Sequence, residues 1–368
     1  MNRRSAAPDV RTGLTLGAVR SATSRFACGL VLWLALTSGA ASEATATNGT
    51  VPSDGLMWRQ APNCRLAEVR PTGTPHAGFA LRPPDQTGVT FTNLLPAERH
   101  LLSQILPNGS GVAAADVDLD GWCDLYFCGL KDADNRLYRN LGGWRFADIT
   151  APAGVACAGL DASGAAFADV DGDGDPDLLV NSIGAGTHLF LNDGRGRFAP
   201  APAILNPDRG GTSMGLSDAD GDGDLDLYVG NYRARTVTDA PGTRFGIKMI
   251  DGQPHVTLIN GRPLSDPEWT NRFLFKFEMG PAGRGKFGRE ELGEPDVYYA
   301  NDGRGRFTPV PFTDGGFRDE NGEPLQRPFF DWGLSVLFRD LNGDGAPDLY
   351  LCNDFGTPDR LWSNQGQG

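Results

Sequence analysis

Short apolar runs alternate with acidic, glycine-rich turns along the middle and end of this chain. Four of these runs directly follow an acidic loop, at residues 125–128, 178–180, 227–229 and 349–352. Four other runs, small and apolar, directly precede the same loops, at residues 111–115, 164–168, 213–217 and 335–339. Short runs on either side of a turn are typical of strands rather than helices. The pattern therefore predicts four strand–loop–strand hairpins.

One acidic nine-residue motif closes each predicted hairpin. The motif has Asp or Asn at positions 1, 3 and 5, Gly at position 6 and Asp at position 9, and it covers residues 116–124, 169–177, 218–226 and 340–348. Alternate oxygen-bearing side chains can converge on one point while Gly permits the sharp turn. Solvated Asp-Gly turns without a metal are the alternative, but they do not require this fixed spacing. The motif therefore predicts sites for a hard cation.

Oxygen ligands without paired Cys or His favour Ca²⁺, with Mg²⁺ second, over zinc or copper. An EF-hand needs Glu at position 12, where this chain has Phe127, Val180, Val229 and Leu351, so that alternative fails in all four loops. We predict up to four Ca²⁺ ions, with position 7 supplying only a backbone carbonyl. The predicted metal-site residues are Asp116, Asp118, Asp120, Trp122, Asp124, Asp169, Asp171, Asp173, Asp175, Asp177, Asp218, Asp220, Asp222, Asp224, Asp226, Asp340, Asn342, Asp344, Ala346 and Asp348.

The loops recur with a period that indicates a repeated unit. They begin at residues 116, 169, 218 and 340, so the first two spacings are 53 and 49 residues and the third is 122. A period near 50 residues is typical of a repeated supersecondary unit. Four strand signals stand in the second unit, at residues 164–169, 178–181, 187–192 and 197–200. Each unit is therefore predicted to be four-stranded.

A repeated heptapeptide explains the long third spacing. The sequence NDGRGRF joins the last two strands of the second unit at 192–198 and recurs at 301–307. Such a sequence is typical of a hairpin turn. The outer strands of the third unit are therefore expected within 297–312, and residues 232–296 form an insertion between its second and third strands.

Four-stranded units with small residues in their first strand predict a β-propeller, because Ala and Gly fit beside the crowded central axis. The sequence GAAFADVDGDGDPDL at 164–178 resembles the FG-GAP repeat, also called the VCBS-like or integrin alpha N-terminal repeat. The sequences NRLYRN at 135–140 and FADIT at 146–150 resemble bacterial exported proteins of the ASPIC/UnbV group, which are similar to cartilage acidic protein. The resemblance covers about 88–368. It implies an all-β, seven-bladed propeller whose loop aspartates bind Ca²⁺.

The expected domain order is a signal peptide at 1–40, an N-terminal linker at 41–87 and an FG-GAP-type β-propeller segment at 88–368. The fourth unit stops before its last strand, so we expect an incomplete propeller from a fragment or a truncated gene product. Residues 88–93 are a candidate closing outer strand from the N-terminus. The expected blades span residues 110–150, 163–203, 211–313 and 332–368.

The first 40 residues resemble an export signal. Five Arg precede an apolar core at 26–36, and a plausible cleavage site follows at 38–40. The apolar stretch is short for a transmembrane helix, and an uncleaved anchor is the alternative. We expect an exported protein that is periplasmic, secreted or on the cell surface. It would touch a membrane only if this segment stays uncleaved.

The net charge limits the kind of partner, and the cysteine count limits the disulfides. The formal net charge is −13, and the four loops hold 17 Asp, so much of the charge belongs to the predicted metal sites. So acidic a chain argues against nucleic acid as a partner. The five Cys after residue 40 are an odd number, which prevents complete intrachain pairing, and no disulfide is assigned.

The function predicted is a non-catalytic, calcium-binding scaffold for adhesion or for recognition of an extracellular protein or glycan. Aromatic and basic residues mix in the insertion 232–296, which makes it the candidate recognition surface; a self-packing hairpin is the alternative. No nucleophile, phosphate-loop or metalloprotease motif occurs. The alternative function is a Ca²⁺-dependent polysaccharide lyase or another carbohydrate-active enzyme, with an acid/base pair among Glu290, Glu291 and Glu294.

Overall fold

The computed structural model describes residues 58–61, 64–67, 78–99, 105–236, 242–266, 269–279, 285–354 and 356–366. The chain divides into two compact units, Met1–Gly78 and Phe79–Gly368. The described residues of the first unit include one antiparallel hairpin of β1 (Trp58–Ala61) and β2 (Cys64–Ala67). The predicted signal peptide and most of the predicted linker lie outside the described residues. No helix among the described residues is long and apolar enough to cross a membrane.

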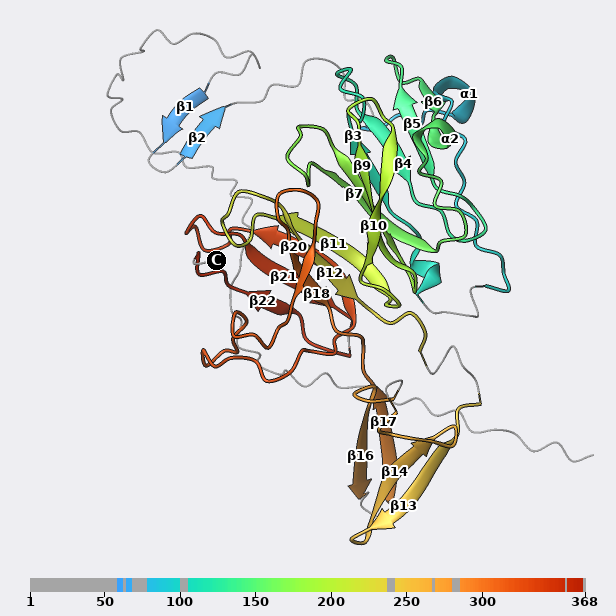
Figure 1. Ribbon diagram of the computed structural model, residues 1–368, viewed down its shortest axis with the longest axis vertical. Coiled ribbons are helices and arrows are strands. Elements are labelled where there is room, and N and C mark those ends of the chain that lie inside the picture. The colour runs from blue at the N-terminus through green and yellow to red at the C-terminus, as the bar shows by residue number, and fades with distance from the viewer. Residues whose placement is uncertain are drawn as a thin grey trace, which may run out of the picture. The chain divides into compact units, whose positions relative to one another are not determined.

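Four antiparallel sheets of the predicted repeat make up the described core of the second unit (Figure 1). The first comprises β3 (Val112–Ala115), β4 (Asp124–Phe127), β5 (Arg136–Asn140) and β6 (Phe146–Asp148). The second comprises β7 (Ala162–Ala168), β8 (Asp177–Ser182), β9 (Gly186–Asn192) and β10 (Phe198–Leu205). The third comprises β11 (Gly211–Ser217), β12 (Asp226–Asn231), β18 (Val297–Ala300) and β19 (Thr308–Val310). The fourth comprises β20 (Gly333–Arg339), β21 (Asp348–Asn353) and β22 (Arg360–Trp362).

The all-β prediction is confirmed, because the remaining regular structure in the second unit is short. It consists of α1 (Pro84–Thr87), α2 (Thr150–Ala153) and the 3₁₀ turn η1 (Leu106–Asn108), together with the hairpins of the insertion. The four strand signals of the second repeat correspond to β7–β10, and the outer strands expected within 297–312 are β18 and β19. The described sheets do not close into a ring.

Neighbouring sheets meet through their first strands: β3 lies beside β7, β7 beside β11, and β11 beside β20. The approach is too close for larger side chains. A Cβ atom added to Gly111 would lie 2.8 Å from the Cα of Gly164, and one added to Gly215 would lie 2.7 Å from the Cγ1 of Val336. The close approach of neighbouring sheets therefore explains why the first strands are built from small residues.

Both apolar and polar contacts hold the sheets together. Separate buried clusters fill the space between the first and second, second and third, and third and fourth sheets. At the starts of the first strands, the Ser163 hydroxyl donates to the Gly211 carbonyl at 2.8 Å. Equivalently, the Thr212 hydroxyl donates to the Gly333 carbonyl at 2.7 Å. The same hydrogen bond thus recurs at two successive seams.

The insertion folds into its own small β structure between β12 and β18. It comprises β13 (Phe245–Ile250), β14 (Gln253–Ile259), β15 (Arg262–Pro263), β16 (Phe273–Met279) and β17 (Gly285–Glu291). The first three form one antiparallel sheet and the last two form a hairpin. Their core contains the buried Val256, Ile259, Trp269 and Phe273. Several aromatic residues proposed for recognition are thus packed inside the insertion, as the alternative of a self-packing hairpin requires.

Residues 88–93 do not form the expected closing strand; none of them lies in a strand. The Phe91 ring instead stacks on Phe127 at a centroid distance of 5.2 Å. The Thr90 amide donates to the Tyr138 hydroxyl at 3.2 Å. The segment therefore covers part of the first sheet through side-chain contacts. The Phe91 ring packs on this sheet although its backbone does not pair with a strand.

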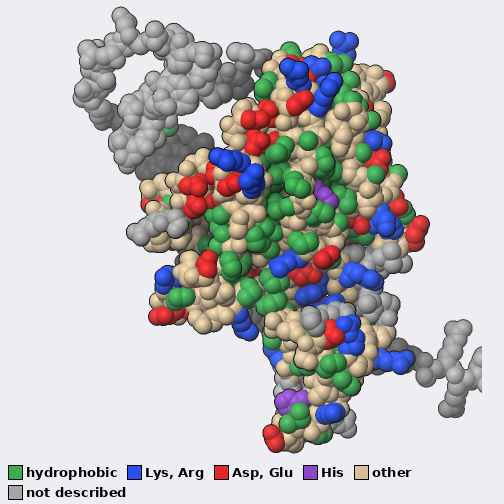
Figure 2. All heavy atoms as spheres, viewed as in Figure 1, with side chains coloured by type: hydrophobic (Ala, Val, Ile, Leu, Met, Phe, Trp, Pro, Cys, Tyr) green, Lys and Arg blue, Asp and Glu red, His purple; other side chains and the backbone are tan. Residues whose placement is uncertain are grey.

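Prolines mark the free edge of the second sheet. The edge strand β10 reads FAPAPAIL, and its register against β9 shifts between Pro200 and Ile204. Proline has no amide hydrogen to donate, so this edge cannot extend the sheet regularly. Figure 2 shows hydrophobic side chains gathered over this part of the face.

Candidate metal centres

Each acidic loop joins the first and second strands of its sheet, so all four lie at the same end of their sheets. Carboxylate oxygens of Asp116, Asp118 and Asp124 lie within 4.8 Å of one another. The second loop brings together Asp169, Asp171 and Asp177 in the same way, and the third brings together Asp218, Asp220 and Asp222. In the fourth loop Asn342 occupies position 3, and its amide donates to Asp344 at 2.9 Å. Three of the four predicted centres thus bring at least three carboxylates together.

The loops hold their shape through hydrogen bonds to their own backbone. In the second loop Asp169 accepts from Gly172 at 2.8 Å and from Gly174 at 3.1 Å. Gly174 has a φ of +95°, which only glycine adopts readily. In all four loops the amide of position 7 donates to the exposed carboxylate of position 5. These pairs are Trp122 with Asp120, Asp175 with Asp173, Asp224 with Asp222, and Ala346 with Asp344.

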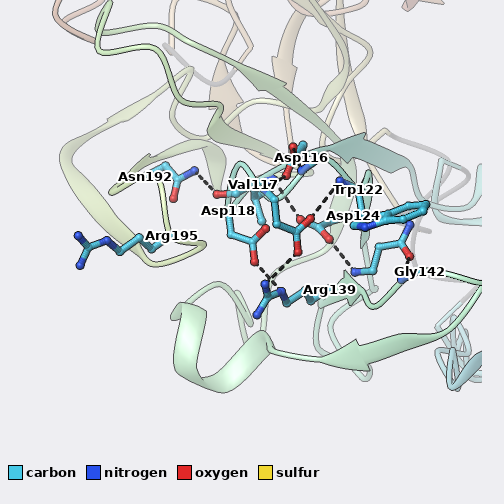
Figure 3. A network of polar contacts seen from close by, with 12 residues as sticks. Asp116, Val117, Asp118, Trp122, Asp124, Arg139, Gly142, Asn192 and Arg195 are labelled. Atoms are coloured by element: carbon cyan, nitrogen blue, oxygen red, sulfur yellow. Dashed lines mark hydrogen bonds and ion pairs between the residues drawn. The ribbon is translucent and has the colours of Figure 1, made fainter.

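The ninth-position Asp has a structural role that the sequence did not reveal. All four are buried, with at most 2% exposure. One carboxylate oxygen accepts from the amide of position 2, and the other accepts from the amide of an Asn at or just beyond the end of the third strand (Figure 3). The corresponding sets are Asp124 with Val117 and Asn140, Asp177 with Val170 and Asn192, Asp226 with Ala219 and Asn301, and Asp348 with Leu341 and Asn364.

The same Asn residues tie each sheet to the loop of the preceding sheet. The Asn192 side chain donates to the Val117 carbonyl at 2.9 Å. Asn301 donates to Val170 at 2.8 Å, and Asn364 donates to Ala219 at 2.7 Å. The Asn that opens each NDGRGRF turn was the available sequence signal, but its partner lies in another repeat. We name these contacts the asparagine clips.

Buried oxygen atoms without a partner test whether a cation fits. The Oδ1 atoms of Asp118, Asp175 and Asp224 are buried and accept no hydrogen bond. Leaving a buried polar group unsatisfied costs about 1–3 kcal/mol, and more when it is charged. A hard cation would satisfy such oxygens, and the donor set of the second and third loops consists of carboxylates and backbone carbonyls. These two loops therefore fit Ca²⁺.

Crowding of carboxylates raises several pKa values in these loops. Burial first, and then the neighbouring carboxylates, raise the pKa of Asp175 and of Asp224 to about 6. Burial also raises the pKa of Asp177 to about 6, against the effect of the two amides that donate to it. Burial is also the main cause that raises the pKa values of Asp171 and Asp220. The loops thus concentrate negative charge that a cation would neutralise.

Calcium-free protein is expected to lose stability as the pH rises from about 4 to about 6. The folded pKa values lie above the unfolded value, so their contribution is present below about pH 4 and is lost as the pH passes the folded pKa. For the buried Asp177, a pKa near 6 corresponds to roughly 3 kcal/mol. Urea unfolding in calcium-depleted buffer at several pH values measures the slope. A double variant, Asp175→Asn with Asp224→Asn, should flatten it; an identical slope would contradict this assignment.

The candidate acid/base residues are not brought together into one site. Glu290 pairs with Lys276 at 3.0 Å, and Glu291 pairs with Arg272 at 2.9 Å. These two glutamates are adjacent on β17, so their side chains point to opposite faces. Glu294 accepts from the Gly210 amide at 2.7 Å. The lyase alternative therefore gains no support from these residues.

A cavity of about 280 Å³ lies at the ends of the first strands away from the acidic loops. Its lining includes Gly111, Ser163, Thr212 and Leu334, one from each sheet, together with Ile105. None of its lining residues carries a titratable side chain. The cavity was not predicted from the sequence, and its lining among the described residues offers hydroxyl, amide and apolar groups.

Comparison with known proteins identifies the repeat. No curated protein sequence matches the chain. A solved structure with 16% identity, the crystal structure of the V. cholerae biofilm matrix protein Bap1, covers 65% of this chain and 34% of that chain, with a TM-score of 0.27. The chain thus spans about a third of that protein, and so low a TM-score carries no structural argument. The likeness to the ASPIC/UnbV group stays a prediction. A family described as an FG-GAP-like repeat matches residues 116–180 and 169–229, so the chain contains two FG-GAP-like repeats, each beginning at an acidic loop.

Proposed function

We propose that this chain is an exported, calcium-stabilised scaffold built from a segment of a β-propeller. The observation that carries the proposal is the convergence of carboxylates in the second and third loops, each with a buried oxygen that accepts no hydrogen bond. Crowded carboxylates of this kind are stabilised by a divalent cation. Two FG-GAP-like repeats at the same residues support the assignment.

In this proposal the side chains at positions 1, 3, 5 and 9, with the carbonyl of position 7, hold the ion. In the second and third loops the position 7 side chains, Asp175 and Asp224, add negative charge beside it, and the ion would offset the cost of their unpartnered Oδ1 atoms. When bound, the ion neutralises the carboxylates of one loop and cross-links its turn. The asparagine clips extend the effect, because the carbonyl of position 2 in the first three loops accepts from the next sheet. An ordered loop therefore supports the seam between two sheets as well as its own hairpin.

Two further observations support the propeller and the export. The first strands of successive sheets lie side by side, and a separate apolar cluster fills each seam, as in the blades of a propeller. The N-terminal pattern of basic residues, apolar core and small residues supports export, where free Ca²⁺ is abundant enough for weak sites. The proposed role is non-catalytic.

The insertion is the proposed recognition element, and its surface favours a protein partner over a glycan. Sugar stacking needs exposed aromatic faces, but Trp269 and Phe273 are only 6% and 9% exposed. The exposed side chains on its strands are instead aliphatic: Ile247, Met249 and Leu274 are 51%, 67% and 45% exposed. Exposed aliphatic side chains suit contact with a protein surface better than stacking on a sugar ring.

Calcium titration of the full chain tests the metal assignment. Wild-type protein should bind calcium, and each of Asp171→Ala and Asp220→Ala should lose about one bound ion by isothermal titration calorimetry, because each removes the position 3 ligand. Asp193→Ala is the matched control, since Asp193 is exposed, belongs to a hairpin turn and lies outside the loops. The proposal is overturned if wild-type protein binds no calcium at millimolar concentration, or if the control loses as many ions as the loop variants.

A further inference from the structure

The first loop carries a cation of its own. Arg139 lies on β5, immediately before Asn140, the residue equivalent to Asn192, Asn301 and Asn364 of the asparagine clips. Its Nε lies 2.5 Å from Asp118, and its Nη2 lies 2.9 Å from Asp120 (Figure 3). These are the carboxylates at positions 3 and 5, the same positions that are predicted to hold calcium. The guanidinium therefore pairs with one oxygen of each of these two carboxylates, while the Oδ1 of Asp118 stays buried without a hydrogen-bond partner.

The other sheets have no such cation at the equivalent position. The residue before the clip Asn is Leu191, Ala300 or Ser363. Among the described residues, no Lys or Arg forms an ion pair with a carboxylate of the second, third or fourth loop. Arg139 is thus a local departure from the repeat rather than a feature of it.

The first loop also departs from the others in one residue and in its hydrogen bonds. Position 4 has a positive φ in all four loops, but in the first it is occupied by Leu119, with a φ of +56°, where the others have glycine. The amide of Asp120, at position 5, donates to Asp116 at 3.0 Å. In the second and third loops the amide of position 5 donates to the carboxylate of position 3, and in the fourth it donates to the side-chain amide oxygen of Asn342. The first loop therefore has a different internal hydrogen-bond pattern as well as a different charge balance.

We infer that Arg139 is the built-in counter-ion of the first loop and that this loop takes no divalent cation while Arg139 is in place. The inference rests on the proposed calcium function of the other loops. Asp118 is buried beside the guanidinium, with 9% of its side chain exposed, so a divalent ion would have to displace Arg139 or share its oxygens against charge repulsion. The first loop would keep part of its negative charge balanced without calcium, whereas the second and third would need an ion for this.

Trp122 provides a reporter for this one loop. It stands at position 7 of the first loop, so Tb³⁺ bound there as a calcium surrogate should emit on excitation of the Trp122 indole. In wild-type protein the emission should be unchanged by Trp122→Phe. In the Arg139→Ala variant a new emission should develop, and adding Trp122→Phe should remove it.

Exchanging residues between equivalent positions gives the second measurement. Arg139→Ala places in the first sheet the residue that the third sheet has, and it should add about one bound calcium per chain by calorimetry. Ala300→Arg makes the reverse exchange and should remove about one ion from the third loop. Arg136→Ala is the matched control, because Arg136 lies on the same strand and faces Asp134 and Asp148 outside the loop.

Two outcomes would overturn the inference. One is a wild-type Tb³⁺ emission that disappears in Trp122→Phe, which would show that the first loop takes a cation beside Arg139. The other is an Arg139→Ala variant that gains neither emission nor an ion, which would show that Arg139 does not exclude the metal. A wild-type protein whose second and third loops bind no calcium overturns the proposed function instead, and the emission of Arg139→Ala still decides the role of Arg139.

Discussion

Replacing Asp226 by alanine is expected to lower the free energy of unfolding of calcium-free protein by about 4 kcal/mol. The Asp226 carboxylate is fully buried and accepts from three donors. These are the Ala219 amide at 3.1 Å, the Asn301 amide at 3.0 Å and the Tyr298 hydroxyl at 2.7 Å. Each buried donor that loses its acceptor costs about 1–3 kcal/mol, and the relief of a buried charge offsets part of the total. Urea unfolding in excess chelator measures the difference.

Asp222 provides the matched control for this prediction. It belongs to the same loop at position 5, but it is exposed and accepts only the Asp224 amide, at 3.2 Å. Asp222→Ala should change the calcium-free stability by less than about 1 kcal/mol. In saturating calcium both variants should lose the stabilisation of the third loop. Equal effects of the two substitutions in chelator would show that the hydrogen bonds to the buried ninth-position Asp do not stabilise the calcium-free fold.

Calcium is expected to stabilise the wild-type protein by about 5 kcal/mol when its concentration is 100 times the dissociation constants of the second and third loops. An ion that binds only the folded state contributes about 2.7 kcal/mol per site at this ratio. For a chain of this size the gain corresponds to a rise in Tm of roughly 7–9 °C. Differential scanning calorimetry with calcium and with chelator measures it.

Magnesium and loop variants make this second prediction specific. Mg²⁺ should stabilise less at equal concentration, because it demands a tighter octahedral shell and gives up its waters reluctantly. The double variant Asp171→Ala with Asp220→Ala removes the position 3 ligand of both loops and should lose most of the calcium-dependent rise. A wild-type Tm that chelator leaves unchanged would mean that the loops do not take part in stability through a metal.

Through the asparagine clips, each of the first three loops also contacts the following sheet, beyond its own hairpin. The carbonyls of Val117 and Val170 also accept from Gly196 and Gly305, so each receives two donors from the following sheet. Ordering of a loop is therefore coupled to the seam beside it. Loss of calcium is expected to loosen each seam at its loop end before it unfolds the apolar cluster that fills the seam.

Local spacing was enough to predict the hairpins, the acidic loops and the position of the insertion. An alternating set of oxygen-bearing residues with Gly at position 6 imposes a turn through bonds within nine residues, and the second and fourth loops have such bonds from the amides of positions 4 and 6 to the Asp of position 1. The repeated NDGRGRF turn likewise located β18 and β19 beyond a long insertion, because a hairpin turn depends only on its own residues.

Tertiary contacts decided the rest, because their partners are far apart in the chain. Asn301 finds its carbonyl acceptor 131 residues away, and Arg139 reaches Asp118 across two strands. The aromatic residues of the insertion looked like a binding surface until Trp269 and Phe273 proved to pack against each other. The sequence alone determined the turns and the strands that flank them, since these depend on neighbouring residues. The folded chain alone showed which loop has an arginine beside its carboxylates and which side chains of the insertion stay exposed. Both depend on contacts between strands that are separated in the sequence.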